Sequence, residues 1–209
     1  MDQQHASLET LQDIKRIMDR SSRFISLSGL SGVSAGFFAL IGAYFAYDLT
    51  REYYVRYTDR GWDAADFNQL KWNLFALAAS VLAGALVFAY YFTWRRAKKS
   101  NVPMWDHTSK KLLINLMIPL LVGGIFVMGL LDHDDWRFVA PACLIFYGLA
   151  LVNASKYTLT EIRYLGLLEI TLGLINMWLP YKGLYFWAVG FGVLHIVYGL
   201  IMWWKYESH

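Results

Sequence analysis

Two titratable side chains, Glu169 and His195, stand near the middle of long apolar stretches of the sequence. A charged side chain at the centre of a membrane-spanning helix costs at least about 2.5–3.5 kcal/mol on insertion scales, so such residues usually face the interior of a helix bundle and mark function. Asn176 shares a helix face with Glu169. The three residues predict a polar site within a membrane, where a carboxyl and an imidazole are the groups that a proton-coupled carrier or relay would use.

A purely structural role is the alternative for this polar site, because buried polar contacts also hold membrane helices together. Only residues 180–183 join the helix of Glu169 to the helix of His195. Helices with such a short connection are expected to be antiparallel neighbours. At a rise of about 1.5 Å per residue, both side chains fall within roughly 2 Å of the midplane. The sequence therefore predicts that Glu169 and His195 approach each other in either role.

A weaker candidate site is the acidic turn Asp132-His133-Asp134-Asp135. Carboxylate oxygens suit hard divalent cations, but such ions take about six ligands, which one short turn rarely supplies. The alternative is a solvated turn in which Asp135 caps the following helix. The single cysteine, Cys143, excludes a multi-cysteine metal site. The cofactor stays unknown, although haem is disfavoured because a two-haem bundle would need four histidines in the membrane and His195 is the one inside a predicted span.

The motif Gly29-Leu30-Ser31-Gly32 resembles the serine motif of rhomboid intramembrane proteases, which have a six-helix core and a histidine in the last core helix. The resemblance would make Ser31 a nucleophile and His195 its base. The rhomboid serine lies in the fourth core helix, whereas Ser31 opens the first predicted helix here. The neighbouring G-x-S-x-G string needs a strand–turn–helix context to be catalytic. An intramembrane enzyme is therefore the third hypothesis, behind the two functions given below.

Long apolar blocks must position these residues. Hydrophobic residues make up 57% of the 209-residue chain and charged residues 17%, against roughly 45–50% and about 25% in soluble domains. A membrane crossing needs about 20 apolar residues. The predicted fold is all-α, a polytopic membrane protein with a single six-helix transmembrane bundle. Its helices are expected at residues 24–47, 72–94, 112–131, 138–157, 161–179 and 184–204.

Details at the helix ends leave some alternatives open. The last two apolar blocks also fit a re-entrant hairpin, because the fifth is short and ends at Pro180. Residues 158–161, Thr-Leu-Thr-Glu, match a capping box at the start of that fifth helix. Residues 48–71 form the longest outer segment. They are expected to make an interfacial helix with a solvated face, or to fold over the mouth of the bundle.

Basic residues set the predicted orientation. With the N-terminus in the cytoplasm, thirteen of the 19 Lys and Arg residues fall on the cytoplasmic side and six on the outer side. An excess of Lys and Arg in cytoplasmic loops is the rule for membrane proteins. Both termini are therefore predicted to be cytoplasmic, in a bacterial inner membrane. The net charge of +3, without a basic stripe, argues against a nucleic-acid partner.

Two features are candidate surfaces for a protein partner or a second copy of the chain. Residues 8–20, within the cytoplasmic segment 1–23, have the pattern of an amphipathic helix that lies on the membrane or binds a partner. Small residues on one face of the first helix allow close helix packing in lipid, either inside the bundle or against another subunit. This small-residue stripe consists of Ser28, Gly32, Ala35, Ala39, Gly42 and Ala46.

Through residues 21–32, SSRFISLSGLSG, the chain resembles uncharacterised six-helix bacterial integral membrane proteins, a resemblance that implies no activity. We expect one transmembrane domain, residues 24–204, flanked by cytoplasmic segments 1–23 and 205–209. The leading hypothesis is permeation or transport of a small solute or ion, coupled to protons at the polar site. The alternative is a non-catalytic membrane sensor or accessory subunit that acts through a protein partner.

Overall fold

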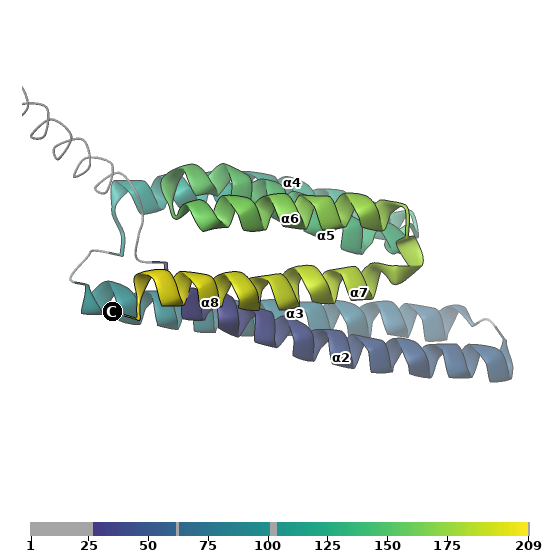
Figure 1. Ribbon diagram of the computed structural model, residues 1–209. Coiled ribbons are helices and arrows are strands. Elements are labelled where there is room, and N and C mark those ends of the chain that lie inside the picture. The colour runs from purple at the N-terminus through teal and green to yellow at the C-terminus, as the bar shows by residue number, and fades with distance from the viewer. Residues whose placement is uncertain (1–26, 62, 101–103, 209) are drawn as a thin grey trace, which may run out of the picture.

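The computed structural model describes residues 27–61, 63–100 and 104–208, and helices make up nearly all of these residues (Figure 1). Within these ranges no residue is in a strand, so the predicted all-α class is confirmed. The predicted amphipathic helix at residues 8–20 lies outside the described ranges. The elements are α2 (Gly29–Arg60), α3 (Ala64–Lys99), α4 (His107–Asp132), η1 (Trp136–Phe138), α5 (Val139–Ala154), η2 (Ser155–Tyr157), α6 (Thr160–Met177), η3 (Pro180–Lys182), α7 (Gly183–Trp187), η4 (Ala188–Leu194) and α8 (His195–Tyr206).

Five helical segments among the described residues are long and apolar enough to cross a membrane. They are α2, α3, α4, the segment Trp136–Tyr157 and the segment Pro180–Tyr206. Helix α6 is not among them, and three of its 18 residues, Glu161, Arg163 and Glu169, are ionisable. It nevertheless runs beside α5 and α8 along the length of the bundle, which does not support the re-entrant alternative (Figure 1). These helices suggest a multi-pass membrane protein.

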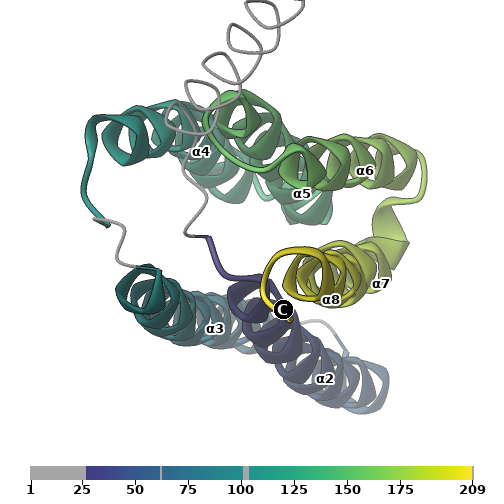
Figure 2. The ribbon, with the colours of Figure 1, turned by 60° about the vertical axis from the view of Figure 1, so that its left-hand side comes forward.

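The helices form two layers of three, with α4, α5 and α6 in one and α3, α2 and α8 in the other (Figures 1 and 2). We call them the α5 layer and the α2 layer after their central helices. In each layer the central helix packs against both of its neighbours. We name the two ends of the bundle after a residue at each. The Glu207 end holds the start of α2 and the end of α8, and the Asp134 end holds the α4–α5 turn (Figure 1).

Helices α2 and α3 extend well beyond their predicted spans and project past the Asp134 end as a hairpin (Figure 1). Most of residues 48–71 thus continues these two helices. The expected exposed helical face is present, but the segment is neither a separate interfacial helix nor folded over the mouth of the bundle (Figure 1). Gly61 makes the turn with a φ of 83°, in the region that favours glycine, and Asp63 caps α3 by accepting from the Ala65 amide. Buried Tyr53 packs against Phe67 across the hairpin, with ring centroids 5.9 Å apart.

Glycines bring the backbones of α2 and α8 together. A Cβ on Gly36 would lie only 2.5 Å from the Gly192 carbonyl oxygen and 3.0 Å from the Ile196 amide nitrogen. Gly32 faces the backbone of Gly199 in the same way. Such close approach is the usual way that helices associate in lipid, where apolar burial gives no drive.

The small-residue stripe does not form one contact face. Gly32 meets α8, but Gly42 faces Val81 of α3. Ala39 is buried, whereas Ala35 and Ala46 are half-buried. The contact face toward α8 is instead made by Gly29, Gly32 and Gly36, which follow a slightly different helical row. The described contacts of the stripe are thus within the chain, shared between two neighbouring helices.

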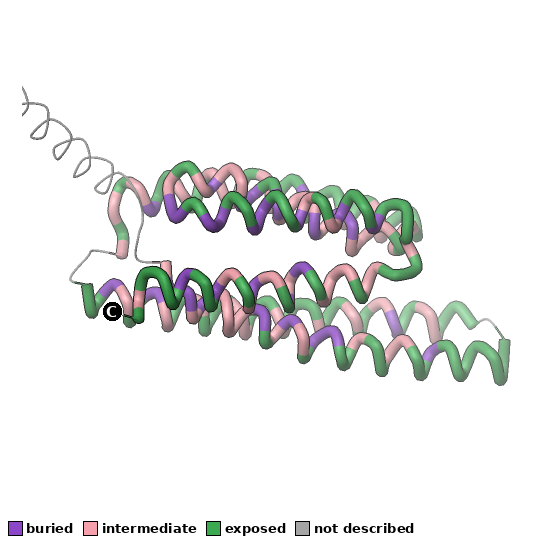
Figure 3. The backbone as a smooth tube through the Cα atoms, viewed as in Figure 1, coloured by how far each residue is buried: buried purple, intermediate pink, exposed green. Residues whose placement is uncertain are grey.

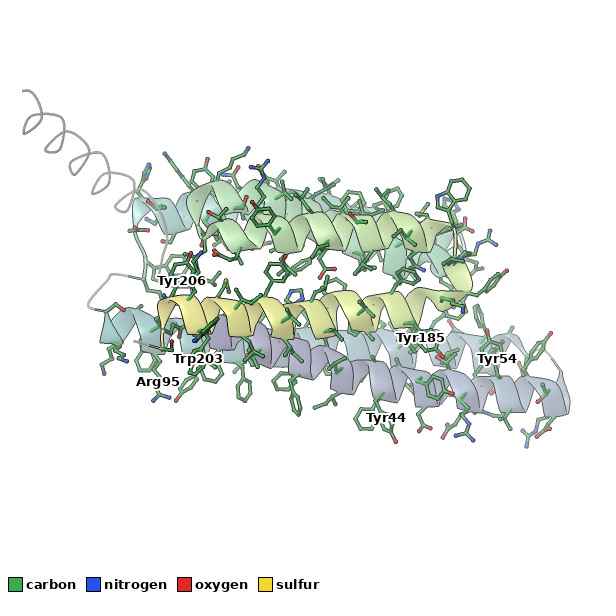
Figure 4. All side chains as sticks on the ribbon, viewed as in Figure 1. Tyr44, Tyr54, Arg95, Tyr185, Trp203 and Tyr206 are labelled. Carbon is green, nitrogen blue, oxygen red and sulfur yellow. The ribbon has the colours of Figure 1, made fainter. Side chains whose placement is uncertain are left out.

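Buried residues gather where α2 meets α8 and where α5 meets α6, while the outward faces are exposed and apolar (Figure 3). Helices α3 and α4 are the extreme cases, with large exposed side chains such as Phe75, Leu86, Ile118 and Ile125. Tyr44 of α2 likewise projects away from the two layers (Figure 4). Apolar surface of this extent suits contact with the hydrocarbon of a bilayer.

Candidate functional site

Glu169 of α6 and His195 of α8 meet between the two layers, as the sequence predicts. Glu169 Oε1 lies 3.5 Å from His195 Nδ1. Glu169 has no exposed surface and His195 is 6% exposed. The short η3–α7 connection folds α8 back along α6, which brings two residues at equal distances from the turn to the same level. The pair is therefore enclosed by the bundle, near the middle of α6 and of the segment Pro180–Tyr206.

Both ring nitrogens of His195 have further partners, and these assign its tautomer. Nδ1 lies 3.0 Å from the Gly190 carbonyl oxygen, and Nε2 lies 2.7 Å from the Tyr147 hydroxyl. A carbonyl oxygen only accepts, so a neutral imidazole carries its proton on Nδ1 and accepts the Tyr147 proton at Nε2. Tyr147 of α5 thus joins the pair to form a three-residue cluster, Tyr147–His195–Glu169.

The π-helical segment η4 shapes the space around the carboxyl. Gly190 lies in η4, five residues before His195, and supplies the carbonyl that Nδ1 contacts. A Cβ on Gly190 would lie 2.5 Å from both Glu169 Oε2 and Leu144 Cδ2. A larger residue at this position would therefore displace the Glu169 carboxyl and the Leu144 side chain. π-helical turns are rare and are frequently found at functional sites.

The Glu169 carboxyl is buried without a hydrogen-bond partner in the part of the chain that the structure describes. An isolated carboxylate in apolar surroundings is far more costly than the neutral acid. Two groups can relieve that cost, a proton on the carboxyl itself or a positive charge on the nearby imidazole. The arrangement is suited to holding a proton on either of two adjacent side chains.

Asn176 lies apart from this cluster, although it belongs to the same buried face of α6. It is seven residues beyond Glu169, which corresponds to about 10 Å along the helix. Its Nδ2 donates to the Leu179 carbonyl at 2.9 Å, and its Oδ1 is buried without a hydrogen bond among the described residues. The structure thus brings Glu169 and His195 together, but places Asn176 nearer the η3 turn.

The acidic turn is engaged in ion pairs. Asp134 contacts Lys71 of α3 at 2.9 Å, and Asp135 contacts Arg137 at 3.5 Å. Asp135 precedes η1 but its side chain makes no capping hydrogen bond, so the expected cap is wrong. Within the described ranges, no group of three or more His, Cys, Asp or Glu side chains is placed to hold a metal ion.

The rhomboid-like Ser31 contacts no catalytic partner in the part of the chain that the structure describes. The Ser31 hydroxyl donates to the Ser28 carbonyl oxygen one turn earlier. The ring nitrogens of His195 face Tyr147, Gly190 and Glu169 instead. This geometry does not support a serine–histidine pair.

The half-buried carboxylate of Glu207 connects the three helices of the α2 layer at the Glu207 end. Glu207 accepts hydrogen bonds from the Ser28 hydroxyl at 3.0 Å and from the Gly29 amide, so it caps the start of α2. Arg96 of α3 pairs with the same carboxylate at 3.1 Å and also donates to the Leu27 carbonyl. An anion at a helix N-terminus is favourable because unpaired amides and the helix dipole attract it. The contact ties α2, α3 and α8 together.

A second contact at this end joins the two layers. Glu161 of α6 pairs with Lys205 at 2.6 Å and accepts from the Tyr206 hydroxyl at 3.1 Å. Tyr206 lies at the Glu207 end of the bundle (Figure 4). Helix α6 begins one residue later than the capping box at residues 158–161 predicts, with Leu159 as its N-cap. The glutamate of that motif, Glu161, binds the end of α8.

We expect Glu207→Gln to lower the free energy of unfolding by about 1–2 kcal/mol, since it weakens a helix cap and an ion pair with little exposure. The measurement is thermal or denaturant unfolding in detergent. Glu52→Gln is the matched control, because the Glu52–Arg56 pair is exposed on α2, with its side chains 62% and 48% accessible. Equal losses in the two variants would show that Glu207 is not a stabilising cap.

Comparison of the chain with protein families, curated proteins and solved structures gives no match.

Proposed function

We propose that the chain is a six-span membrane transport protein in which Glu169 and His195 bind and release a proton as a small solute or ion crosses. The supporting observation is the Glu169 carboxyl, which is fully buried, without a hydrogen bond in the described structure, and 3.5 Å from an imidazole. Ionisable residues at membrane depth are typical of proton relays and ion pathways.

The cluster can hold the proton in two arrangements. With the proton on Glu169, both partners are neutral and the Tyr147 hydroxyl donates to His195 Nε2. With Glu169 ionised and a second proton on Nε2 of His195, the imidazolium faces the Glu169 carboxylate, and Nε2 now donates to the Tyr147 oxygen. A phenol both donates and accepts, so Tyr147 satisfies His195 in each arrangement. Because Nδ1 already carries a proton, the second imidazole proton is gained and lost at Nε2, and the Glu169 carboxylate 3.5 Å from Nδ1 stabilises the imidazolium.

The accessory-subunit alternative has no supporting contact among the described residues. The small-residue stripe of α2 packs against α8 and α3. The other candidate surface, the N-terminal amphipathic helix, falls within residues that the structure does not describe. Transport is therefore the function that the described geometry favours.

The proposal is tested by proton binding and proton flux. Purified protein should take up a proton on an acid pulse, measured with an indicator dye, and its infrared difference spectrum should contain the band of a protonated carboxyl. Both signals should be lost in Glu169→Gln and kept in Glu52→Gln. In proteoliposomes under a potassium diffusion potential, dye-reported proton entry should fall in the same variant. Unchanged uptake in Glu169→Gln would overturn the proposal.

The proposed topology places both termini in the cytoplasm of a bacterial cell, with the α2–α3 hairpin outside. It rests on the excess of basic residues on one side of the predicted spans. In a Cys143→Ser background, Arg60→Cys should react with an impermeant thiol reagent on intact spheroplasts, whereas Lys99→Cys should react only after permeabilisation. Labelling of both positions from one side would contradict six spans.

A further inference from the structure

Helix α6 and the η4–α8 segment share one sequence pattern. Aligned without gaps, residues 166–178 and 192–204 are identical at seven of thirteen positions. The identical pairs are Gly166/Gly192, Leu168/Leu194, Ile170/Ile196, Gly173/Gly199, Leu174/Leu200, Ile175/Ile201 and Trp178/Trp204. In this register Glu169 corresponds to His195. The two members of the proton site therefore occupy the same position in two related helices.

The packing of the two helices follows the same correspondence. A Cβ on Gly148 of α5 would lie 2.5 Å from Gly166 O, 2.7 Å from Ile170 Cγ1 and 2.9 Å from Ile170 N. A Cβ on Gly36 of α2 would lie 2.5 Å, 2.7 Å and 3.0 Å from the corresponding atoms of Gly192 and Ile196. Helix α5 thus sits on α6 as α2 sits on η4–α8.

The outer helices complete the pattern, because α4 packs on α5 as α3 packs on α2 (Figure 2). Helices α6 and α8 run in opposite directions on either side of the η3 turn. The pairs α6/α8, α5/α2 and α4/α3 each run in opposite directions, as a twofold axis that passes across the helices between Glu169 and His195 would require (Figure 1). Layers related in this way have inverted orientations in a membrane.

Each layer is held together by its own polar contacts. In the α2 layer, Arg96 and Glu207 connect α3, α8 and the start of α2. In the α5 layer, Asn153 of α5 donates to the Asn115 carbonyl of α4 at 2.9 Å. Because these contacts lie within layers, the layers are suited to move as rigid bodies.

Contacts between the layers lie at both ends of the bundle. At the Glu207 end, Glu161 binds Lys205 and Tyr206. At the Asp134 end, Asp134 binds Lys71, and Phe67 packs on Trp136 with ring centroids 5.1 Å apart. With both ends bridged, Glu169 has no exposed surface.

We infer that the two layers rock about the Glu169–His195 contact, so that one end of the bundle opens while the other closes. This inference rests on the proposed proton-coupled transport and describes how its site reaches each side in turn. Inverted repeats related by an axis in the membrane plane carry their sites at the repeat interface and alternate by this kind of motion. The structure corresponds to the enclosed intermediate, from which either pair of end contacts can break.

Two spin-label pairs test the motion in a Cys143→Ser background. Labels at Lys98 and Arg163 report the Glu207 end, and labels at Asn68 and Trp178 report the Asp134 end; all four side chains are exposed. Glu161→Gln should lengthen the first distance and shorten the second. Lys71→Gln, which weakens the contact at the other end, should produce the reverse shifts. Glu52→Gln, on the exposed part of α2, should leave both distances unchanged.

Opposite shifts at the two ends in both variants are the expected result. Distances that stay fixed in both variants, or that lengthen together at both ends, would overturn rocking. The two proposals fail separately. Proton uptake at Glu169 without opposite shifts removes the rocking motion alone, whereas opposite shifts without proton uptake remove proton coupling alone.

Discussion

Gly36→Leu is expected to lower the free energy of unfolding by about 3 kcal/mol or more, at the upper end of what overpacking costs. Even a Cβ at this position would lie within 3.0 Å of backbone atoms of Gly192 and Ile196. Backbone atoms of a packed helix cannot turn aside as a side chain can, so α2 would have to move away from α8. The measurement is thermal unfolding of the purified protein in detergent.

Gly124→Leu is the matched control for this substitution. Gly124 also lies within an apolar helix, but nothing comes within 4 Å of a Cβ built on it. The control variant should unfold within about 0.5 kcal/mol of the parent protein, as surface substitutions usually do. Similar losses in both variants would mean that α2 and α8 are not in backbone contact, and that leucine simply disturbs any glycine of the chain.

His195→Gln is expected to destabilise the protein by about 2–4 kcal/mol, because buried polar groups that hydrogen-bond the imidazole would be left without a partner. The Tyr147 hydroxyl loses its partner at 2.7 Å, and the ring also packs against those of Tyr147 and Phe191. Glu169→Gln should also impair stability or activity. The double variant should cost less than the two single losses combined, with a coupling of about 0.5–3 kcal/mol.

The control for the pair is Asn176→Leu combined with His195→Gln. Asn176 is buried on the same face of α6 but lies two turns from the pair. Its effect should add to that of His195→Gln within about 0.5 kcal/mol, as separated sites usually do. Strictly additive effects for Glu169 and His195 would remove the case for a shared site.

The approach of Glu169 and His195 could be predicted because it depends on short-range features, the connection at residues 180–183 and the helical rise. The third member, Tyr147, could not. Tyr147 reaches His195 from α5. Neither the helical periodicity of the sequence nor the lengths of its connections determine how α5 is rotated about its own axis relative to α8. The signal that was available is the adjacent Gly148, which marks the face of α5 that packs closely on α6.

Two other differences have related causes. In the π-helical turn Ala188–Leu194, backbone hydrogen bonds join residues five apart, where an α-helix would join residues four apart. Tertiary packing selects between the two, so the local sequence does not predict the turn. The full length of α2 and α3 could not be predicted, because hydropathy indicates where a helix leaves the lipid and not where the helix ends. The aromatic contact between Tyr53 and Phe67 stabilises the continuation.

Because the α2–α3 hairpin is long, a small rotation of α2 inside the bundle produces a large displacement of the hairpin turn. From Gly36, at the contact with α8, to the turn at Gly61 the distance along α2 is about 37 Å, given the rise per residue of a helix. A rotation of α2 by about 10° at Gly36 would therefore displace that turn by roughly 6 Å at this lever length. Small changes of angle in the packed interior thus become movements at the hairpin tip that a fluorescent probe at Arg60 resolves.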